Sequence, residues 1–484
     1  MVCAFALHLA FPLTGWWWLA PWASAGLLAS WCALRVRTAA WVGFASGMVF
    51  FGFGFSWFAE SAGALVGPAA PLLILGPAAL ESLAFAAVAA VCAYAARCCD
   101  VRAVPFVAAA AYALAEQIRS QGVMGAPLSQ IGVAMLDSPL RALAAFLGGY
   151  GITFATVLLG SSLGWWLLAR DDMRRAYVTL GCWLGVIIVA AGAWALWPAR
   201  HIAAPTRVVA AVQGGIAQSI KRSDGGIPLA IARYTSLTAS LRAAHPQIVL
   251  WPETVITEDY ANDPALDARF ARLATDTGAR LYVGTLVATQ HGAYNALRVY
   301  GGGSRAVYFK EQLVPFAEYL PGPDWLRALP LADQIGAYAP GINAVETIDG
   351  ATPLICWESD FADIAHARLA DDPSLFLVST DDAWFGTTQG PYEQAAASTM
   401  RAVETGRWVL RAAATGISGI IAPDGSWTRR TTISTIPTTV LGKVGAPAPA
   451  LYARIGPTPV GLVLALIVLV PVLMPLLRRK RGSA

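Results

Sequence analysis

Long stretches of apolar residues with almost no charge fill the first 200 or so positions of this chain and return at its end. Before about Arg200 the chain is mostly Ala, Leu, Val, Phe, Trp and Gly, whereas charged residues are mixed with short apolar runs from about Ala203 to Arg454. After Gly456 comes PTPVGLVLALIVLVPVLMPLL, which RRKR closes. Since a membrane-spanning helix needs about 20 apolar residues, the pattern predicts two membrane-embedded parts with a soluble segment between them.

The overall composition agrees with a membrane protein. Charged residues make up 13% of the 484 residues and hydrophobic residues 56%, whereas a soluble domain carries about 25% charged residues. The net charge of +4 is modest, so we expect no nucleic-acid partner.

The apolar pattern predicts three domains. Residues 1–198 form an N-terminal transmembrane domain with about seven spans, residues 199–455 a soluble α/β domain, and residues 456–484 a last span with a basic tail. The first span is short, which leaves open a re-entrant or interfacial segment. The candidate spans are 2–14, 16–34, 39–59, 70–96, 103–119, 140–169, 176–197 and 456–477.

Positive charge alternates along the connections between these spans. RVR (35–37), RCCDVR (97–102), RDDMRR (170–175) and RRKR (478–481) hold the clustered Arg and Lys residues. The alternate connections, around 61–69 and 120–138, contain none. Because cytoplasmic connections carry an excess of positive charge, the basic clusters are predicted in the cytoplasm and the soluble domain on the outer face.

The soluble segment alternates between strand-like and helix-like runs, which predicts a layered α/β domain. Helices are expected over 262–278, where Asp-Pro marks the start and Gly278 the end, and over 390–406, which ends at Gly406. A pair of strands with a PDG turn is expected over 409–425. The expected strands before it are 206–215, 247–254, 279–287, 305–313, 351–359 and 374–385.

Cysteine and histidine usage limits the chemistry. Cys356 is the only cysteine of the soluble segment, so no internal disulfide or cysteine metal cluster is expected there. The five histidines show neither HxxxH nor HExxH spacing. With no glycine-rich phosphate-binding motif either, we expect no metal and no cofactor.

Three reactive residues each follow a strand-like run. Glu253 ends IVLWPE, Lys310 ends AVYFK and Cys356 ends TPLIC. A carboxylate takes a thiol proton as general base, and a lysine stabilises a thiolate and an oxyanion. Taken alone, each residue also has a simpler interpretation: an inert core cysteine, a carboxylate at a helix start, and a solvated strand end.

The motifs around these residues resemble the Glu-Lys-Cys triad of the nitrilase superfamily, and more narrowly bacterial apolipoprotein N-acyltransferase. The resemblance covers nearly the whole chain. It rests on WPET, YFKEQLVPFAEYLP, ICWES, STDDAWFGTTQGP, AVQGGIAQSIK, MRAVETGRWVLRAAATGISGIIAPDG and AEQIRSQGVMGAPLSQIG.

The resemblance implies a nitrilase-like αββα sandwich attached to a multi-span helical domain, and a two-step acyl transfer. Cys356 would form a thioester with an acyl chain from a membrane phospholipid, and the N-terminal amine of an apolipoprotein's lipid-modified cysteine would then accept it. Glu253 would be the base and Lys310 would hold the oxyanion, with Glu318 supporting Lys310. Glu358 would lie on the same side as Cys356 if the strand continues. The enzyme would be a monomer in the bacterial inner membrane, with its catalytic domain in the periplasm.

The chain departs from the usual family pattern at several positions. Ala317 stands in place of Gly, Trp357 in place of Tyr, Asp381 in place of Asn, and Ala414-Thr415 in place of Asn-Asn. These differences leave open a paralogue that acts on another acyl acceptor, such as the related proteins encoded with conjugation systems. The sequence also leaves open a periplasmic amidase with the same triad and an inactive binding or assembly factor.

Overall fold

The computed structural model describes residues 1–202, 204–257, 262–303, 306–322, 327–328, 335–342 and 347–481. The chain divides into two compact units. Residues 1–197 and 450–484 form one, here called the helical unit, and residues 198–449 form the other, here called the sandwich unit.

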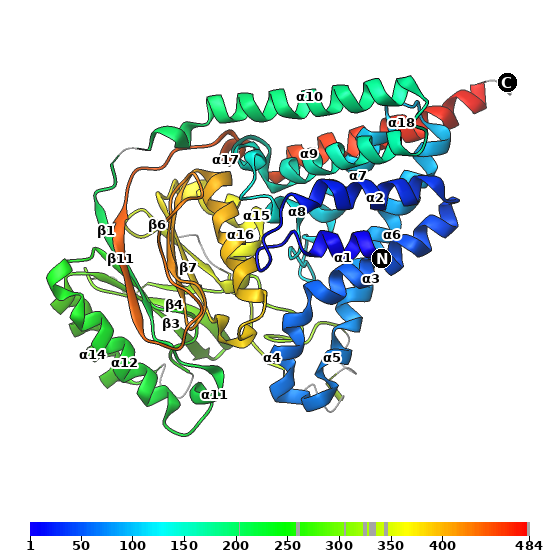
Figure 1. The fold of residues 1–484 in the computed structure, drawn as a ribbon. Coiled ribbons are helices and arrows are strands. Elements are labelled where there is room, and N and C mark those ends of the chain that lie inside the picture. The colour runs from blue at the N-terminus through cyan, green and yellow to red at the C-terminus, as the bar shows by residue number, and fades with distance from the viewer. Residues whose placement is uncertain are drawn as a thin grey trace. The chain divides into compact units, whose positions relative to one another are not determined.

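The helical unit contains the long apolar helices that the sequence predicts (Figure 1). Five helical stretches in the described part of the chain are long and apolar enough to cross a membrane: Val36–Gly54, Ala70–Cys98, Pro139–Leu167, Met173–His201 and Pro457–Met474. The helices are α1 (Val2–His8), α2 (Leu19–Ala33), α3 (Val36–Gly54), α4 (Ser56–Val66), α5 (Ala70–Leu73), α6 (Leu75–Cys98), α7 (Val104–Arg119), α8 (Ile131–Ala134), α9 (Ala144–Leu167), α10 (Met173–Leu196), α17 (Leu451–Ile455) and α18 (Pro457–Arg481).

The predicted spans 2–14, 16–34 and 103–119 are not among these five stretches, because α1, α2 and α7 have only 7, 15 and 16 residues. The short first segment, predicted over 2–14, is helical only over Val2–His8. The segment predicted over 39–59 is broken, because α3 ends at Gly54 and α4 begins at Ser56. Glycine favours such a break since it loses more backbone freedom in a helix than any other residue.

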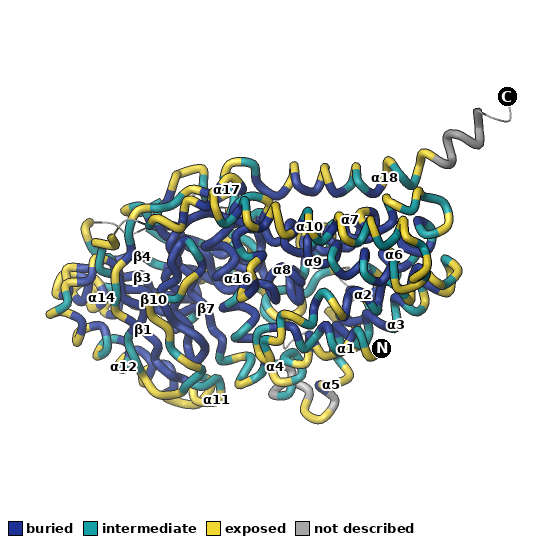
Figure 2. Tube along the Cα trace, turned by 45° about the horizontal axis from the view of Figure 1, so that its top comes forward, coloured by how far each residue is buried: buried dark blue, intermediate teal, exposed yellow. Residues whose placement is uncertain are grey.

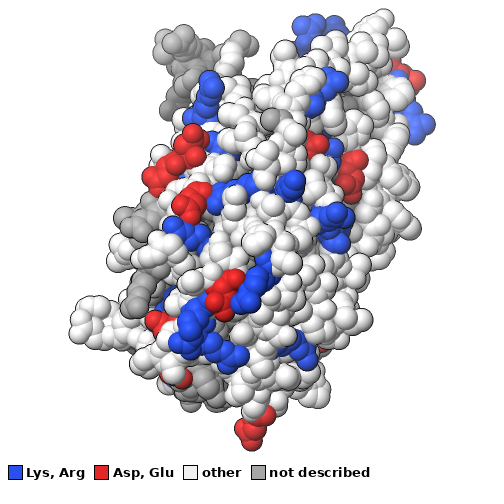
Figure 3. Space-filling view, turned by 90° about the vertical axis from the view of Figure 1, so that its left-hand side faces the viewer, with Lys and Arg blue, Asp and Glu red and all other residues white. Residues whose placement is uncertain are grey.

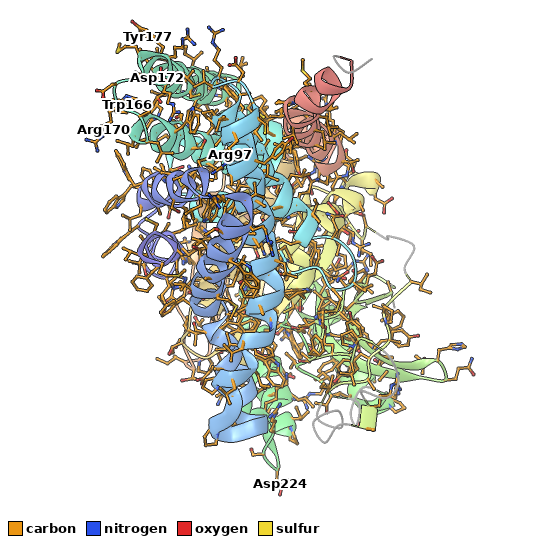
Figure 4. All side chains as sticks on the ribbon, turned by 90° about the vertical axis from the view of Figure 1, so that its right-hand side faces the viewer. Arg97, Trp166, Arg170, Asp172, Tyr177 and Asp224 are labelled. Atoms are coloured by element: carbon orange, nitrogen blue, oxygen red, sulfur yellow. The ribbon has the colours of Figure 1, made fainter. Side chains whose placement is uncertain are left out.

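Helices α3 and α6 pack closely because α3 places glycines at the contact. A Cβ atom on Gly47 would lie 2.8 Å from the Cα of Ser82, and one on Gly43 would lie 2.6 Å from the carbonyl oxygen of Phe85. Small residues at helix contacts are typical of membrane bundles. Figure 4 labels Arg97, in the last turn of α6, and Arg170, in the connection between α9 and α10.

The sandwich unit is built from two sheets. The first has the strand order β11-β1-β2-β3-β4-β5 and the second β10-β9-β8-β7-β6. Strands β1–β2–β3 and β6–β7–β8 run parallel, and the other pairings are antiparallel. The bounds are β1 (Arg207–Gln213), β2 (Ile248–Leu250), β3 (Arg280–Thr289), β4 (Gly292–Tyr300), β5 (Val307–Phe309), β6 (Ala351–Ile355), β7 (Leu375–Thr380), β8 (Trp408–Ala413), β9 (Gly419–Ile421), β10 (Trp427–Arg430) and β11 (Thr438–Val444).

Three apolar layers confirm the predicted αββα sandwich. Side chains such as Leu250 and Leu377 fill the core between the sheets. Helices α12 (Gly226–Ser240) and α14 (Pro264–Thr277) cover the first sheet through residues such as Phe270. Helices α15 (Ala362–Ala367) and α16 (Gly390–Thr405) cover the second through Ala365 and Ala402. Strands β2, β6, β7 and β8 are accordingly buried, whereas β10 is mostly exposed and α11 (Gln218–Lys221) and α12 carry exposed residues (Figure 2).

The helix signals read from the sequence are confirmed. Asp263 caps α14, where its carboxylate accepts hydrogen bonds from the Ala265 and Leu266 N–H groups at 2.8 and 3.4 Å. Gly278 and Gly406 end α14 and α16 in the left-handed conformation, with φ of 69° and 65°, which glycine adopts without strain.

One strand prediction is wrong in a way that matters for the site. The strand expected over 351–359 ends at Ile355, and Cys356–Asp360 form a 3₁₀ turn, η7. Glu358 therefore does not continue the strand beside Cys356. Strands β4, β10 and β11 and helix α12 were not predicted, and Arg305, the start of one expected strand, lies outside the described residues.

Surface charge is mixed in sign. Figure 3 shows Lys and Arg side chains interspersed with Asp and Glu side chains over one face of the protein. The mixture agrees with the small net charge.

Candidate active site

The three reactive residues predicted from the sequence meet inside the sandwich unit. Glu253 follows β2, Lys310 follows β5 and Cys356 follows β6, so both sheets contribute. The Lys310 Nζ atom lies 2.9 Å from a Glu253 oxygen. All three side chains are buried, with relative exposures of 6%, 1% and 7% for Glu253, Lys310 and Cys356. The site therefore combines a base, a cation and a thiol away from bulk water.

Cys356 sits on a sharp turn between β6 and η7. Its φ is 50°, in the left-handed region that residues with a Cβ atom rarely adopt. The turn is held by the Ser359 hydroxyl, which donates to the Cys356 carbonyl at 2.9 Å. The Gln394 side-chain amide lies 3.6 Å from the Cys356 sulfur. Backbone strain of this kind clusters at functional sites, and here it turns the thiol out of the strand line.

Glu253 is held as an ionised base by three donors. Besides Lys310, the Asn295 side-chain amide donates to one Glu253 oxygen at 2.6 Å, and the Asp381 backbone N–H donates to the other at 2.9 Å. Hydrogen bonds to a charged carboxylate favour that form. The geometry fixes the direction in which the carboxylate faces.

Glu318 completes the surroundings of Lys310. Its two oxygens lie 3.0 and 2.9 Å from Lys310 Nζ, and they also accept from the Asn295 amide and the Val314 N–H, both at 2.8 Å. Lys310 is thus bonded to two carboxylates. Asn295 bridges the same two carboxylates, so all four side chains form one network.

Electrostatics set the resting proton positions. Burial and the nearby Glu253 carboxylate raise the pKa of the Cys356 thiol well above its usual range, and Lys310 offsets this only in part. Burial alone would raise the pKa of Glu253, but Lys310 and the hydrogen bonds from Asn295 and Asp381 hold it below its usual range. Burial would lower the pKa of Lys310, yet Glu253 and Glu318 hold it well above its usual range. The resting site therefore holds a neutral thiol beside an ionised base and a cation.

Glu358 joins the segment that carries Cys356 to the segment that carries Lys310. One oxygen accepts the Ile355 N–H at 2.7 Å, and the other accepts the Glu311 N–H and the Tyr308 hydroxyl, each at 2.7 Å. Ile355 precedes Cys356 and Glu311 follows Lys310. The carboxylate thus braces the two segments that carry Cys356 and Lys310, although it does not lie beside Cys356 on a strand as expected.

Trp357 directly follows Cys356. Its side chain is buried and packs edge-on against Phe361, with ring centroids 5.9 Å apart. Its indole N–H has no hydrogen-bond partner among the described residues. The arrangement gives Trp357 a packing contact with Phe361.

Two further departures from the family pattern, Ala317 and Ala414, make backbone hydrogen bonds within the sandwich unit. Ala317 belongs to the turn before Glu318, and its N–H donates to the Val314 carbonyl at 3.3 Å. The Ala414 N–H donates to the Thr380 carbonyl at 3.2 Å. Gly416, two residues further, lets the Asp382 side chain lie close to the backbone. A Cβ atom on Gly416 would lie 2.0 Å from an Asp382 carboxylate oxygen.

Several site residues were missed from the sequence. Asn295 lies in β4, whose apolar and polar alternation was not recognised as a strand. The only sequence signal for Asn295 was an amide side chain within this strand. No sequence signal marked Gln394 on α16. Asp382, with zero exposure, pairs with the equally buried Arg411 at 2.9 Å. Within the described residues, no three His, Cys, Asp or Glu side chains group so as to hold a metal ion.

Comparison with known proteins covers both units. Residues 3–162 match the apolipoprotein N-acyltransferase N-terminal domain, and residues 208–437 match the carbon-nitrogen hydrolase domain. An amidase of the nitrilase superfamily from Nesterenkonia AN1 is 19% identical, with a TM-score of 0.37, over 52% of this chain and 95% of the amidase.

Relatives aligned over most of this chain show its family. Apolipoprotein N-acyltransferase of Ralstonia nicotianae is 32% identical, covering 98% of this chain and 92% of the relative. That of Pseudomonas paraeruginosa is 32% identical, covering 81% of this chain and 79% of the relative. For that of Pseudomonas syringae pv. tomato, also 32% identical, the chain spans 62% of the relative's length. With its helical unit and its nitrilase-like sandwich in the same order as these relatives, the chain belongs to the apolipoprotein N-acyltransferase family.

Proposed function

We propose that this protein moves a fatty acyl chain from a membrane phospholipid, through a thioester on Cys356, to the N-terminal amine of a lipoprotein's diacylglyceryl-cysteine. The observation that carries the proposal is the contact between Glu253 and Lys310 beside the strained Cys356 turn. Base, cation and thiol are the groups that covalent acyl transfer requires.

In the first step Glu253 takes the thiol proton as the Cys356 sulfur attacks the ester carbonyl carbon. The raised pKa of the thiol supports proton removal during attack rather than a standing thiolate. Negative charge develops on the carbonyl oxygen, and the Lys310 ammonium stabilises it. The ester C–O bond then breaks, Glu253 returns the proton to the leaving oxygen, and lysophospholipid departs.

In the second step the lipoprotein's amine attacks the thioester carbon. Glu253 removes a proton from the amine, Lys310 again stabilises the oxyanion, and the C–S bond breaks as the sulfur regains a proton. Two covalent steps allow the donor and the acceptor to use one site in turn. Both are lipids, and an acyl chain leaves the bilayer only at about 0.8 kcal/mol per CH₂, which supports a membrane-bound enzyme.

We further propose that the sandwich unit lies on the periplasmic side of the inner membrane. The alternating basic connections support this orientation. The test places a peptide tag in the sandwich unit and treats intact spheroplasts with a membrane-impermeant reagent that labels this tag. We expect labelling before lysis. Labelling only after lysis would overturn it.

The acyl-transfer proposal is tested with a diacylated lipopeptide acceptor and a phospholipid donor in detergent. We expect an N-acylated lipopeptide and an equal amount of lysophospholipid from the wild type, and neither from Cys356→Ala. Hydrolysis of small amides without acyl transfer would favour an amidase instead. The three relatives compared with this chain are all apolipoprotein N-acyltransferases, and none of them supports a different acceptor.

A further inference from the structure

The side chain of Lys221 ties together two segments that flank the base. Lys221 ends the short helix α11, and its Nζ atom donates to the Thr254 hydroxyl at 2.7 Å and to an Asp381 carboxylate oxygen at 2.6 Å. The Thr254 hydroxyl lies 3.4 Å from the same Asp381 oxygen. One ammonium thus joins α11 to the ends of β2 and β7.

Both of these contacts reach residues that position Glu253. Thr254 is the next residue along the chain, and its φ of 50° is strained for a β-branched side chain. Asp381 donates its backbone N–H to the Glu253 carboxylate at 2.9 Å. Holding the Thr254 and Asp381 side chains therefore fixes both the backbone that carries the base and the N–H that orients it.

The ion pair also balances charge at the site. The Asp381 side chain is 1% exposed and Lys221 14%. The neighbouring cations have other partners, since Lys310 contacts Glu253 and Glu318, and Arg411 contacts Asp382. Without Lys221, Asp381 would be a buried carboxylate next to the base. A buried charge left alone is strongly destabilising.

We propose that Lys221 keeps the general base Glu253 in position by neutralising the Asp381 carboxylate, which would otherwise lie unpaired beside that base. The inference rests on the proposed function only in taking Glu253 as the base. Asp381 stands where the family pattern has Asn, so this chain carries an additional acid near its base together with the cation that neutralises it. Among the described residues, neither side chain has a hydrogen bond to Cys356 or Lys310. Both act on Glu253 through Thr254 and the Asp381 N–H.

The test is a cycle of three variants: Lys221→Met, Asp381→Asn and the double variant. Lys221→Met leaves the Asp381 carboxylate unpaired, whereas Asp381→Asn keeps an oxygen that Lys221 can donate to. The double variant leaves no charge unpaired. Lys443→Met, on the exposed part of β11, is the matched control for loss of a lysine.

The first readout is the alkylation rate of Cys356 by iodoacetamide at pH 7, followed by mass spectrometry of the Cys356 peptide. This rate reports how readily the base takes the thiol proton and needs no lipid substrate. The second is single-turnover release of lysophospholipid, and thermal unfolding in detergent checks folding.

We expect Lys221→Met to slow both reactions by at least about tenfold, the rate equivalent of about 1.4 kcal/mol. Lys443→Met should stay within about threefold of the wild type. Asp381→Asn should slow both reactions less than Lys221→Met does, and the double variant should recover to near the Asp381→Asn rate. A Lys221→Met protein as fast as Lys443→Met, or a double variant no faster than Lys221→Met, would overturn the proposal. If the alkylation series behaves as expected but the wild type transfers no acyl chain, the proposed function fails and this inference stands.

Discussion

Replacing Glu358 by Gln removes the charge that braces the Cys356 turn against the Lys310 segment and leaves the side chain's size unchanged. Glu358 accepts from the Ile355 N–H through one oxygen and from the Tyr308 hydroxyl and the Glu311 N–H through the other. An amide has only one acceptor oxygen. The least damaging orientation keeps that oxygen toward Tyr308 and Glu311 and turns the NH₂ group toward the Ile355 N–H.

The magnitude follows from that single mismatch. One hydrogen bond to a charged acceptor, worth about 1.5–3 kcal/mol, is lost, and a buried N–H is left without a partner. We estimate about 2–4 kcal/mol in total. If all of it opposed the reactive geometry, acylation would slow by about 30- to 900-fold, so we expect a loss of at least about tenfold.

The assay is single-turnover release of lysophospholipid with the folded fraction measured in parallel. Glu311→Gln is the matched control, because it removes a carboxylate that pairs with Arg368 in the same cluster but keeps the Glu311 N–H that Glu358 accepts. Because the Arg368 side chain is only 2% exposed, the control also measures the loss of its ion pair, and we expect it to slow acylation less than Glu358→Gln does. A fully folded Glu358→Gln enzyme with the wild-type acylation rate would refute the bracing role.

Two further predictions concern charge and packing. Lys310→Met should slow acylation by about 10²–10³-fold through loss of oxyanion stabilisation. In the wild type the pKa of Glu253 is below its usual range, so the base is ionised above that pKa and activity falls only as pH drops through it. Without Lys310, burial raises the pKa of Glu253, and the acid limb of the pH profile should move upward; an unmoved limb would show that Lys310 does not hold the base. In the helical unit, Gly47→Ala should lower the unfolding temperature in detergent because its Cβ would lie 2.8 Å from Ser82, at about 1–3 kcal/mol. Gly52→Ala on the same helix, with no atom within 4 Å of its Cβ, should not lower it, and equal behaviour of the two would contradict the close packing.

The long apolar helices and the alternation of strands and helices were predictable from local patterns, whereas the αββα arrangement came from the family resemblance. Uninterrupted apolar runs marked the long helices, and Asp263 and Gly278 marked both ends of α14. The break between α3 and α4 was not predictable from hydropathy, since the residues on both sides of Gly54 are equally apolar. Strand β4 was missed because polar residues interrupt its apolar residues, whereas the buried parallel strands form more continuous apolar runs.

Glu253, Lys310 and Cys356 were identified as candidates because each follows a strand-like run and carries reactive chemistry, and the family resemblance joined them. Their network was not predictable. Asn295, the Asp381 N–H and Lys221 reach Glu253 or its neighbours from three separate segments, which only the folded chain brings together. The Cys356 turn was wrongly predicted as a continuing strand, because sequence periodicity does not reveal a positive φ at a residue other than glycine.

The central claim is that Cys356 carries the acyl chain between donor and acceptor. The most direct measurement is the mass of the Cys356 peptide after the wild-type enzyme is incubated with phospholipid and no acceptor. We predict an increase of one acyl group on that peptide, removable by hydroxylamine and discharged by adding diacylated lipopeptide. An unmodified Cys356 peptide under conditions in which lysophospholipid is released, or an acyl adduct that persists in Cys356→Ala, would contradict it.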